Sequence, residues 1–356
     1  MQIIKLNSLA PEDRKKVLEV AVKCLKNQGL IIYPTETVYG VGVDACSSKA
    51  IDKLLTYKGR REGKPLSIAV TDQTMASKYV EINEQALKFY QNFLPGPFTV
   101  VSKSKNLVDP RVNSEFGTLG IRIPDYPLIT ELVKKFGGPI TSTSANASGK
   151  KRPYQIEDIF AHLSSKQKAL IDLVIDAGEL PKNEPSVVVD TTLSTPIALR
   201  GSLHEQKGEI LWSKSEQETL DLAGRLMLNH LNQVQKNGLI FALNGNLGLG
   251  KTIFAKGVAK FLQISENISS PTYSYINEYD YKRFSTQGKF YHIDAWKISS
   301  PEELALLEIE KLAQKNNVIV IEWFEQIATW LKLNKKTKIV TLNFSEEEGL
   351  RKIVLT

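Results

Sequence analysis

The feature that most constrains this chain is one glycine-rich segment, Gly245-Asn246-Leu247-Gly248-Leu249-Gly250-Lys251-Thr252, which fits the pattern G-x-x-x-x-G-K-[ST]. An apolar run at 239–243 precedes it and predicts a strand, and the spacing of Phe254, Val258 and Leu262 after it predicts a helix. Such a turn lets backbone N–H groups surround phosphates at a helix N-terminus. The pattern therefore predicts a P-loop domain whose phosphate-binding residues are Gly245, Asn246, Gly248, Gly250, Lys251 and Thr252.

Acidic residues at two later strand ends add to this site. In a P-loop fold Lys251 reaches the β- and γ-phosphates, and the Thr252 hydroxyl binds Mg²⁺. The apolar run at 318–321 ends in Glu322, and the run at 290–293 ends in Asp294. Either acid alone is typical of a solvated strand end. Beside a P-loop, Glu322 is a candidate magnesium ligand and Asp294 a candidate for orienting a water or metal. His292 has no partners at ligand spacing and is interpreted as a packed or surface histidine.

The length of 356 residues favours two domains. Upstream of residue 200, helical patterns alternate with short apolar runs, which predicts an α/β domain with a mixed sheet. Residues 201–208 are polar and are interpreted as a linker. We therefore expect one domain over residues 1–205 and a P-loop NTPase α/β domain over residues 206–356.

Composition excludes several classes of protein. A hydrophobic share of 42% and a charged share of 24% are typical of a folded chain rather than a disordered one. No apolar run approaches the ~18 residues that a membrane helix needs. Two cysteines are too few for a disulfide framework or a four-thiolate zinc site. The first residues contain no apolar signal core, so a reducing, cytoplasmic location without membrane contact is expected.

Residues 1–205 carry polar clusters instead of a P-loop. Segment 34–42, Pro-Thr-Glu-Thr-Val-Tyr-Gly-Val-Gly, offers the hydroxyls of Thr35 and Thr37 and a flexible backbone after a predicted strand. The basic residues Lys58, Arg60 and Lys64 suit phosphates or carboxylates. Arg122 lies inside an apolar strand, where a cation needs an anion or acid partner. The other candidates are Ser142, Ser144, Asn146, Ser186 and Arg200.

Each cluster also has a plain structural interpretation. Basic runs are usually solvated faces, and runs of serine, threonine and asparagine are usually loops. Residues 1–200 hold 27 basic and 21 acidic residues, an excess that by itself favours surface solubility over a phosphate-rich partner. It is the joint appearance of these clusters in one domain that favours function.

Two families share these motifs. The P-loop, the Ser269-Ser270-Pro271-Thr272-Tyr273 segment and the strands ending in Asp294 and Glu322 resemble, in that order, the bacterial TsaE family. This resemblance covers about residues 209–345 and implies a small ATPase that assists tRNA threonylcarbamoyladenosine synthesis. It implies that Thr272 lies near the nucleotide, that Asp294 positions the hydrolytic water or metal, and that Glu322 and Thr252 surround Mg²⁺. Asn246, Leu249 and Glu308 depart from the residues usual in that family.

The first domain resembles the TsaC/YrdC family of L-threonylcarbamoyladenylate synthases over about residues 10–201. The resemblance rests on the 34–42 segment, the Lys58-x-Arg60-x-x-x-Lys64-Pro65 motif, Pro95-Gly96-Pro97, Arg122, Ser144-Ala145-Asn146 and Pro185-Ser186 before Asp190. It implies a YrdC-like twisted mixed sheet that makes L-threonylcarbamoyl-AMP and pyrophosphate from ATP, L-threonine and bicarbonate.

The resemblance also implies roles for residues of the first domain. Lys58, Arg60 and Lys64 would hold phosphates and bicarbonate, and Thr35 with Arg122 would hold threonine. Ser142, Ser144 and Asn146 would hold ribose, phosphate or the adenylate, with Ser186 and Arg200 as weaker candidates. The chain has no domain for the final transfer, so separate TsaD- and TsaB-like partners are expected, with tRNA involved indirectly.

Other functions remain open from the sequence. The first domain would also suit an RNA-binding module, although the chain lacks a basic stripe with interleaved aromatics. A carbamoyl-transfer maturation factor would need cysteine-rich zinc fingers, against which the two cysteines argue. The P-loop domain would also suit a small-molecule kinase.

Overall fold

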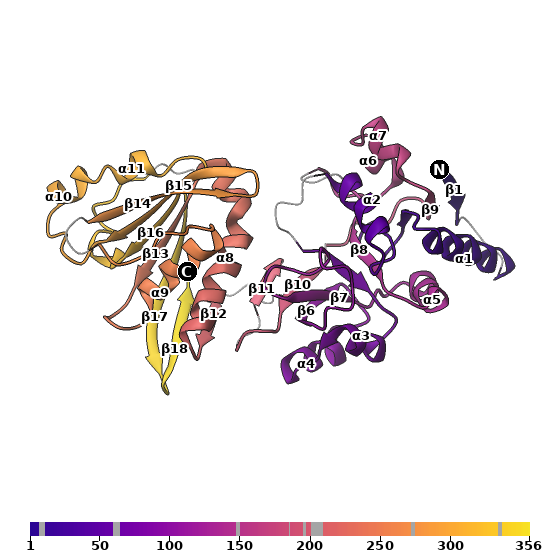
Figure 1. Cartoon of the computed structure of the whole chain (residues 1–356), viewed down its shortest axis with the longest axis horizontal. Helices are drawn as coiled ribbons and strands as arrows, with labels where there is room; N and C mark the ends of the chain where they lie inside the picture. Colours follow the sequence, from indigo (N-terminus) through magenta and orange to yellow (C-terminus); the bar gives the residue numbers. More distant parts are fainter. Residues whose placement is uncertain are drawn as a thin grey trace. The chain divides into compact units, whose positions relative to one another are not determined.

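The computed structural model of the chain describes residues 1–6, 11–59, 65–146, 150–184, 186–194, 197–200, 209–271, 275–333 and 337–356 (Figure 1). Of Pro11, Glu12 and residues 197–200 it describes the backbone alone. The chain divides into two compact units. Unit 1 holds Met1–Thr192 and Ala198–Leu203, and unit 2 holds Leu193–Ile197 and His204–Thr356. The predicted linker at 201–208 lies outside the described residues, so the boundary near residue 205 stays a prediction.

Unit 1 is a mixed sheet with helices packed on it. Its strands follow the order β1-β9-β2-β3-β8-β4-β7-β6-β10-β11, and β5 pairs with β6. The strands are β1 (Gln2–Lys5), β2 (Ile31–Tyr33), β3 (Gly40–Gly42), β4 (Ser67–Ala69), β5 (Val80–Glu81), β6 (Phe98–Ser104), β7 (Thr118–Arg122), β8 (Ile140–Ser144), β9 (Leu173–Asp176), β10 (Val187–Asp190) and β11 (Ile197–Arg200). The helices are α1 (Pro11–Lys26), α2 (Ser48–Lys58), α3 (Gln73–Tyr79), α4 (Glu84–Phe93), α5 (Pro127–Phe136), α6 (Ile156–Phe160) and α7 (Ser165–Ala169).

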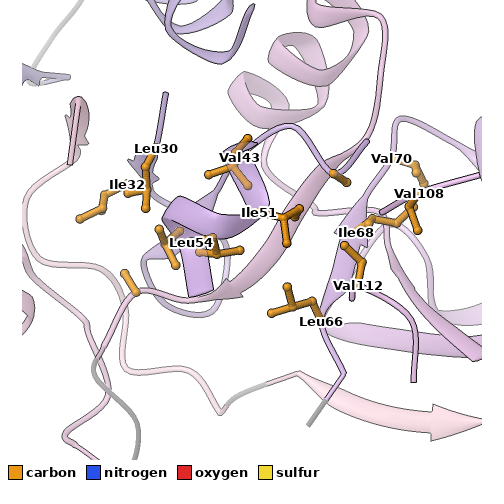
Figure 2. Packing of buried hydrophobic residues seen from close by; sticks show 14 of the residues in the cluster. Leu30, Ile32, Val43, Ile51, Leu54, Leu66, Ile68, Val70, Val108 and Val112 are labelled. Carbon is orange, nitrogen blue, oxygen red and sulfur yellow. The ribbon is translucent and has the colours of Figure 1, made fainter. Parts of the chain in front are cut away.

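Alternation along β2 builds two hydrophobic clusters in unit 1. Ile32 packs in a cluster with Ile51 and Leu54 of α2, which Figure 2 shows from close by. Ile31 and Tyr33 belong to the other cluster, to which α1 and α5 contribute. Successive side chains of a strand point to opposite faces, so this short strand is buried on both sides. A strand buried in this way holds the loop that follows it in a fixed position.

Unit 2 is a second mixed sheet, in the order β12-β18-β17-β13-β16-β15-β14. β13 runs parallel to both β16 and β17, and β15 runs parallel to β16. The strands are β12 (Glu209–Ser213), β13 (Leu239–Asn244), β14 (Ile276–Arg283), β15 (Thr286–Asp294), β16 (Val318–Glu322), β17 (Lys338–Glu347) and β18 (Leu350–Leu355). The helices are α8 (Glu216–Asn237), α9 (Lys251–Phe261), α10 (Pro301–Leu306), α11 (Ile309–Leu312) and the 3₁₀ helix η1 (Phe324–Gln326).

The central strands of unit 2 are covered on both faces. Ile240 of β13 packs in a cluster with Leu304 of α10 and Ile309 of α11. Its neighbour Phe241 meets Phe254 of α9 edge-on, with the ring centroids 5.3 Å apart. Parallel strands that are covered on both faces appear in the sequence as continuous apolar runs. This is why β13 and β16 were predictable from sequence.

The predicted α/β architecture is confirmed, with one local correction. We expected a flexible backbone at Gly40–Gly42, but these residues form the buried strand β3, paired with β2 and β8. A Cβ at Gly40 would lie 3.0 Å from the Tyr33 ring, and one at Gly42 would lie 2.8 Å from the same ring. The glycines therefore serve close packing of Tyr33 rather than mobility. Among the described residues, no helix combines the length and apolar character that crossing a membrane requires.

Candidate functional site

The loop between β2 and β3 is organised by Thr35. Its hydroxyl donates to the carbonyl oxygen of Val38 at 2.6 Å, and its oxygen accepts from the backbone N–H groups of Thr37 and Val38, each at 3.2 Å. The Thr37 hydroxyl lies 3.1 Å from it. Both threonine side chains are buried. Thr35 therefore fixes the shape of this loop and with it the position of Glu36.

Glu36 pairs with Arg122, the cation of β7 for which an anion or an acid partner was expected. The Arg122 Nη2 donates to Glu36 Oε1, and the two side chains are 9% and 15% exposed. Arg122 Nε and Glu36 Oε2 are buried without a hydrogen-bond partner among the described residues. Besides the hydrogen bond between the two side chains, the cationic Arg122 thus keeps one unused donor and the anionic Glu36 keeps one unused acceptor.

Tyr33 senses the charges of this pair. The Tyr33 hydroxyl donates to the carbonyl oxygen of Thr141 in β8 at 3.1 Å. Burial raises the pKa of Tyr33 to about 12, while its hydrogen bond with Ser142 and the charge of Arg122 act in the opposite direction. Ser142 itself is buried and lies in β8 opposite Ser67 of β4. Tyr33 therefore links β8, through Thr141, to the charges of Glu36 and Arg122.

Lys58 lies against the end of β8. Its ammonium donates to the carbonyl oxygens of Ser144 and Asn146, each at 2.8 Å. Burial lowers its pKa to about 8. The Ser144 hydroxyl donates to Asn146 Oδ1 at 2.7 Å, so the two predicted ligand-binding side chains brace each other. Lys58 at the end of α2 and Ser144 and Asn146 on and after β8 thus form one cluster.

The remaining predicted residues of unit 1 are only partly described. Ser186 is buried directly before β10. Arg60 and Lys64 lie outside the described residues, and of Arg200 only the backbone, in β11, is described. The roles given to all these residues by resemblance stay predictions.

The P-loop of unit 2 has the predicted strand–turn–helix context. It joins β13 to α9, and Gly245, Gly248 and Gly250 have φ values of 123°, 82° and 96°. These values lie in the left-handed region, which favours glycine. Lys251 Nζ donates to the carbonyl oxygens of Gly245 at 2.6 Å and Asn246 at 2.8 Å. The lysine and the loop therefore hold each other in place.

Thr252 and Glu322 meet beside the P-loop. The Thr252 hydroxyl donates to Glu322 Oε2 at 3.1 Å and lies 3.2 Å from the Ser270 hydroxyl. The other carboxylate oxygen, Oε1, lies 2.8 Å from Nε2 of His292, which is fully buried. Parallel pairing of β15 and β16 sets Asp294 opposite Glu322. The carboxylate is thus fixed at both oxygens.

The charges around Lys251 shift the pKa values of this site. Burial lowers the pKa of Lys251, and the carboxylates of Glu322, Glu325 and Asp294 act in the opposite direction. Burial, followed by the charge of Glu322, raises the pKa of Asp294. The Lys251 ammonium lies 3.9 Å from the centroid of the Trp323 ring. Thr272, the predicted switch residue, lies outside the described residues.

Sequence reasoning missed two residues. Glu36 was visible only as an acid between two threonines, and nothing in the spacing linked it to Arg122, 86 positions away. His292 was interpreted as packed or at the surface; it is packed, but it also holds Glu322. A histidine two positions before a candidate catalytic acid on an apolar strand is the signal that the sequence offered.

Comparison with protein-family models gives two matches. The Sua5/YciO/YrdC model, described as telomere recombination, matches residues 23–202. The model described as threonylcarbamoyl adenosine biosynthesis protein TsaE matches residues 213–353.

Named relatives match unit 1. A putative threonylcarbamoyl-AMP synthase of Methanocaldococcus jannaschii is 38% identical over 199 residues, which are 56% of this chain and 92% of that protein. The threonylcarbamoyl-AMP synthase of Bacillus subtilis is 31% identical over 182 residues, which are 51% of this chain and 51% of that protein. The chain thus spans nearly all of the first relative and about half of the second.

A solved structure supports the fold. The crystal structure of Pyrococcus abyssi Sua5 complexed with L-threonine has a TM-score of 0.53 at 21% identity, covering 96% of this chain and 99% of that chain. At this identity the likeness concerns the fold alone. The family match over half of the sequence and the synthase relatives identify this chain as a member of the Sua5/YciO/YrdC family that also carries a TsaE domain.

Proposed function

We propose that unit 1 makes L-threonylcarbamoyl-AMP from ATP, L-threonine and bicarbonate, with release of pyrophosphate. The observation that carries this proposal is the placement of two cations, Lys58 and the buried Arg122. Lys58 contacts the end of β8 at Ser144, and Arg122, paired with Glu36, acts on Tyr33, whose hydroxyl donates to Thr141 of the same strand. Family membership and the synthase relatives supply the reaction class.

The chemistry requires such a site. The amine of threonine captures carbon dioxide or bicarbonate as a carbamate, and a carbamate oxygen then attacks the α-phosphorus of ATP. Both reagents are anionic, so fixed cations must offset their repulsion as they approach. The Lys58 ammonium has one N–H beyond the two that its carbonyl partners accept, which supports a role in holding phosphate or bicarbonate.

The pair of Glu36 and Arg122 suits the amino-acid substrate. A guanidinium matches a carboxylate geometrically, and a carboxylate accepts from an ammonium group. Arg122 Nε and Glu36 Oε2, which have no partner among the described residues, supply one group of each kind. Thr35, whose hydroxyl is occupied within its own loop, would act by positioning Glu36. Ser142, Ser144 and Asn146 would border the nucleotide.

Unit 2 would bind and hydrolyse a second ATP. The P-loop would hold its phosphates, with Lys251 on the β- and γ-phosphates and Asp294 orienting water. Oxygen donors are what Mg²⁺ prefers, and the Thr252 hydroxyl and Glu322 carboxylate, 3.1 Å apart, fit that requirement. When bound there, Mg²⁺ would neutralise charge that develops on the phosphates. Among the described residues no cluster of three histidine, cysteine or acidic side chains could hold a metal alone, so phosphate oxygens would complete the shell.

The two activities would serve one product. The adenylate would pass to a separate transferase resembling TsaD and TsaB, which modifies the adenosine beside a tRNA anticodon. Unit 2 would support that transferase, and the chain would act in the cytoplasm, where the tRNA is used. This combination is what a Sua5/YrdC domain and a TsaE domain on one chain support.

The test is pyrophosphate release by the full-length protein with ATP, bicarbonate and each amino acid in turn. Hydrolysis at unit 2 yields ADP and phosphate, so pyrophosphate reports unit 1 alone. We expect threonine to be the only amino acid, or nearly the only one, that supports pyrophosphate release. Lys58→Ala should lower the rate about 100-fold or more, the scale of losing one electrostatic donor. The exposed Lys49→Ala on the same helix should not. Absence of threonine-dependent pyrophosphate would refute the proposal.

A further inference from the structure

Arg351 lies level with the P-loop on a strand that the motif does not include. In β18 it stands opposite Glu346 of β17, and β17 pairs with β13 so that Asn343 stands opposite Asn244. Asn244 is the last residue of β13, and Glu346 lies three positions beyond Asn343. Arg351 is therefore beyond the end of β13, where the P-loop begins. Figure 1 shows β18 between β12 and β17 within this unit.

The Arg351 side chain packs against the last glycine of the loop. A Cβ placed on Gly250 would lie 2.9 Å from Arg351 Nε and 3.1 Å from its Cδ. Gly250 caps the N-terminus of α9 in the left-handed conformation, immediately before Lys251. Its missing side chain is therefore what lets the arginine pass beside the start of the helix whose N–H groups face the phosphates.

The Arg351 guanidinium is held in place by a neutral group. Nη1 donates to the Thr219 hydroxyl of α8 at 3.1 Å. Thr219 is buried and lies 2.8 Å from the Ser213 hydroxyl, which belongs to the residue opposite Arg351 in β12. In the described part of the chain no carboxylate forms an ion pair with Arg351, whereas the next residue, Lys352, pairs with Glu347. A half-buried guanidinium with five N–H donors thus has no ion-pair partner among the described residues.

We propose that Arg351 binds a phosphate group of the nucleotide in the P-loop. Its remaining N–H groups would donate to a phosphate oxygen on the Gly250 side of the loop. The phosphate is opposite in charge to the guanidinium and matches its geometry. Thr219 positions it for this contact. The inference rests on the proposed nucleotide site of unit 2 and adds to that site a residue which the P-loop pattern does not contain.

Tryptophan fluorescence of the full-length protein tests this contact selectively. All tryptophans, at positions 212, 296, 323 and 330, belong to unit 2, so their emission reports on the unit that carries the P-loop. ADP and ATP are titrated into the wild type and into Arg351→Ala, Arg351→Lys and Lys352→Ala. We expect Arg351→Ala to weaken ADP binding about 10-fold or more, the scale of a charge-assisted hydrogen bond. Arg351→Lys should bind ADP with intermediate affinity, because lysine retains the positive charge but lacks the planar guanidinium with its paired N–H donors.

Controls separate the possible failures. Lys352→Ala, which removes a cation from the same strand, should bind ADP as the wild type does. Thr219→Val should weaken binding less than Arg351→Ala, because it removes only the positioning hydroxyl. If Arg351→Ala binds ADP within twofold of the wild type while Lys251→Ala does not bind, the arginine has only a packing role and the proposal is overturned. If the wild type itself fails to bind ADP, the proposed nucleotide site fails with it.

Discussion

Among single residues, Lys58 has the environment that best separates a functional lysine from a surface one. It is held by two backbone carbonyl oxygens, and burial lowers its pKa to about 8. Carbonyl dipoles favour the ammonium form but do not outweigh the loss of hydration. The residue therefore changes charge within a pH range accessible to assay.

This environment predicts how substrate binding depends on pH. A lowered lysine pKa means that the ammonium is charged well below pH 8 and loses its proton as the pH rises through about 8. If only the charged form holds ATP, the KM for ATP in pyrophosphate release should rise about tenfold between pH 7 and pH 9. Lys58→Arg, which keeps its proton throughout, should show a flatter profile. An equal rise in both proteins would exclude Lys58 as the cause.

Residue chemistry was predictable where a local rule demanded a partner. An arginine in an apolar strand must be paired when buried, so an anion or an acid partner for Arg122 was expected. Which acid it would be was not predictable, because Glu36 is brought to Arg122 by sheet pairing between distant segments. The same reason hid the contact of His292 with Glu322 and that of Arg351 with Gly250.

Among the elements, the close packing of α9 on α8 fixes the start of the P-loop helix. Gly257 lies at that contact, where an added Cβ would approach the carbonyl oxygen of Leu220 to 2.6 Å and the Ala223 Cβ to 2.7 Å. The neighbours are backbone and a methyl group attached to it, neither of which can rotate away. The two helices would have to separate to admit a larger residue.

Gly257→Ala should therefore destabilise unit 2 although alanine is the better helix former. We expect a loss of about 1–3 kcal/mol from overpacking, against a gain of about 1 kcal/mol in helix propensity. The midpoint of urea unfolding, followed by tryptophan fluorescence, should fall. The exposed Lys256→Ala on the same helix is the matched control and should leave it unchanged. A higher urea midpoint for Gly257→Ala would show that the gain in helix propensity outweighs the steric conflict with α8.

Elements with a clear period or a continuous apolar run were predicted well. The apolar runs before Gly245 and Glu322 are β13 and β16. The Thr-Ser-Thr-Ser run at 141–144 was interpreted as a loop, but all of it lies in strand β8, which pairs with β3 and β4. Its polar side chains conceal a strand whose place is set by its neighbours.

The whole molecule joins two units, each with its own sheet, core and cation-bearing site. Lys58 belongs to unit 1, and Lys251 to unit 2. If the units carry separate activities, removing one lysine should abolish one activity and spare the other. A single shared nucleotide site would make the two losses coincide.

The most direct measurement is therefore threonine-dependent pyrophosphate release by full-length Lys58→Ala and Lys251→Ala proteins, with ADP binding followed by tryptophan fluorescence in the same samples. The account predicts that Lys58→Ala loses pyrophosphate release and keeps ADP binding, and that Lys251→Ala shows the reverse. Loss of pyrophosphate release in a folded Lys251→Ala protein would contradict it.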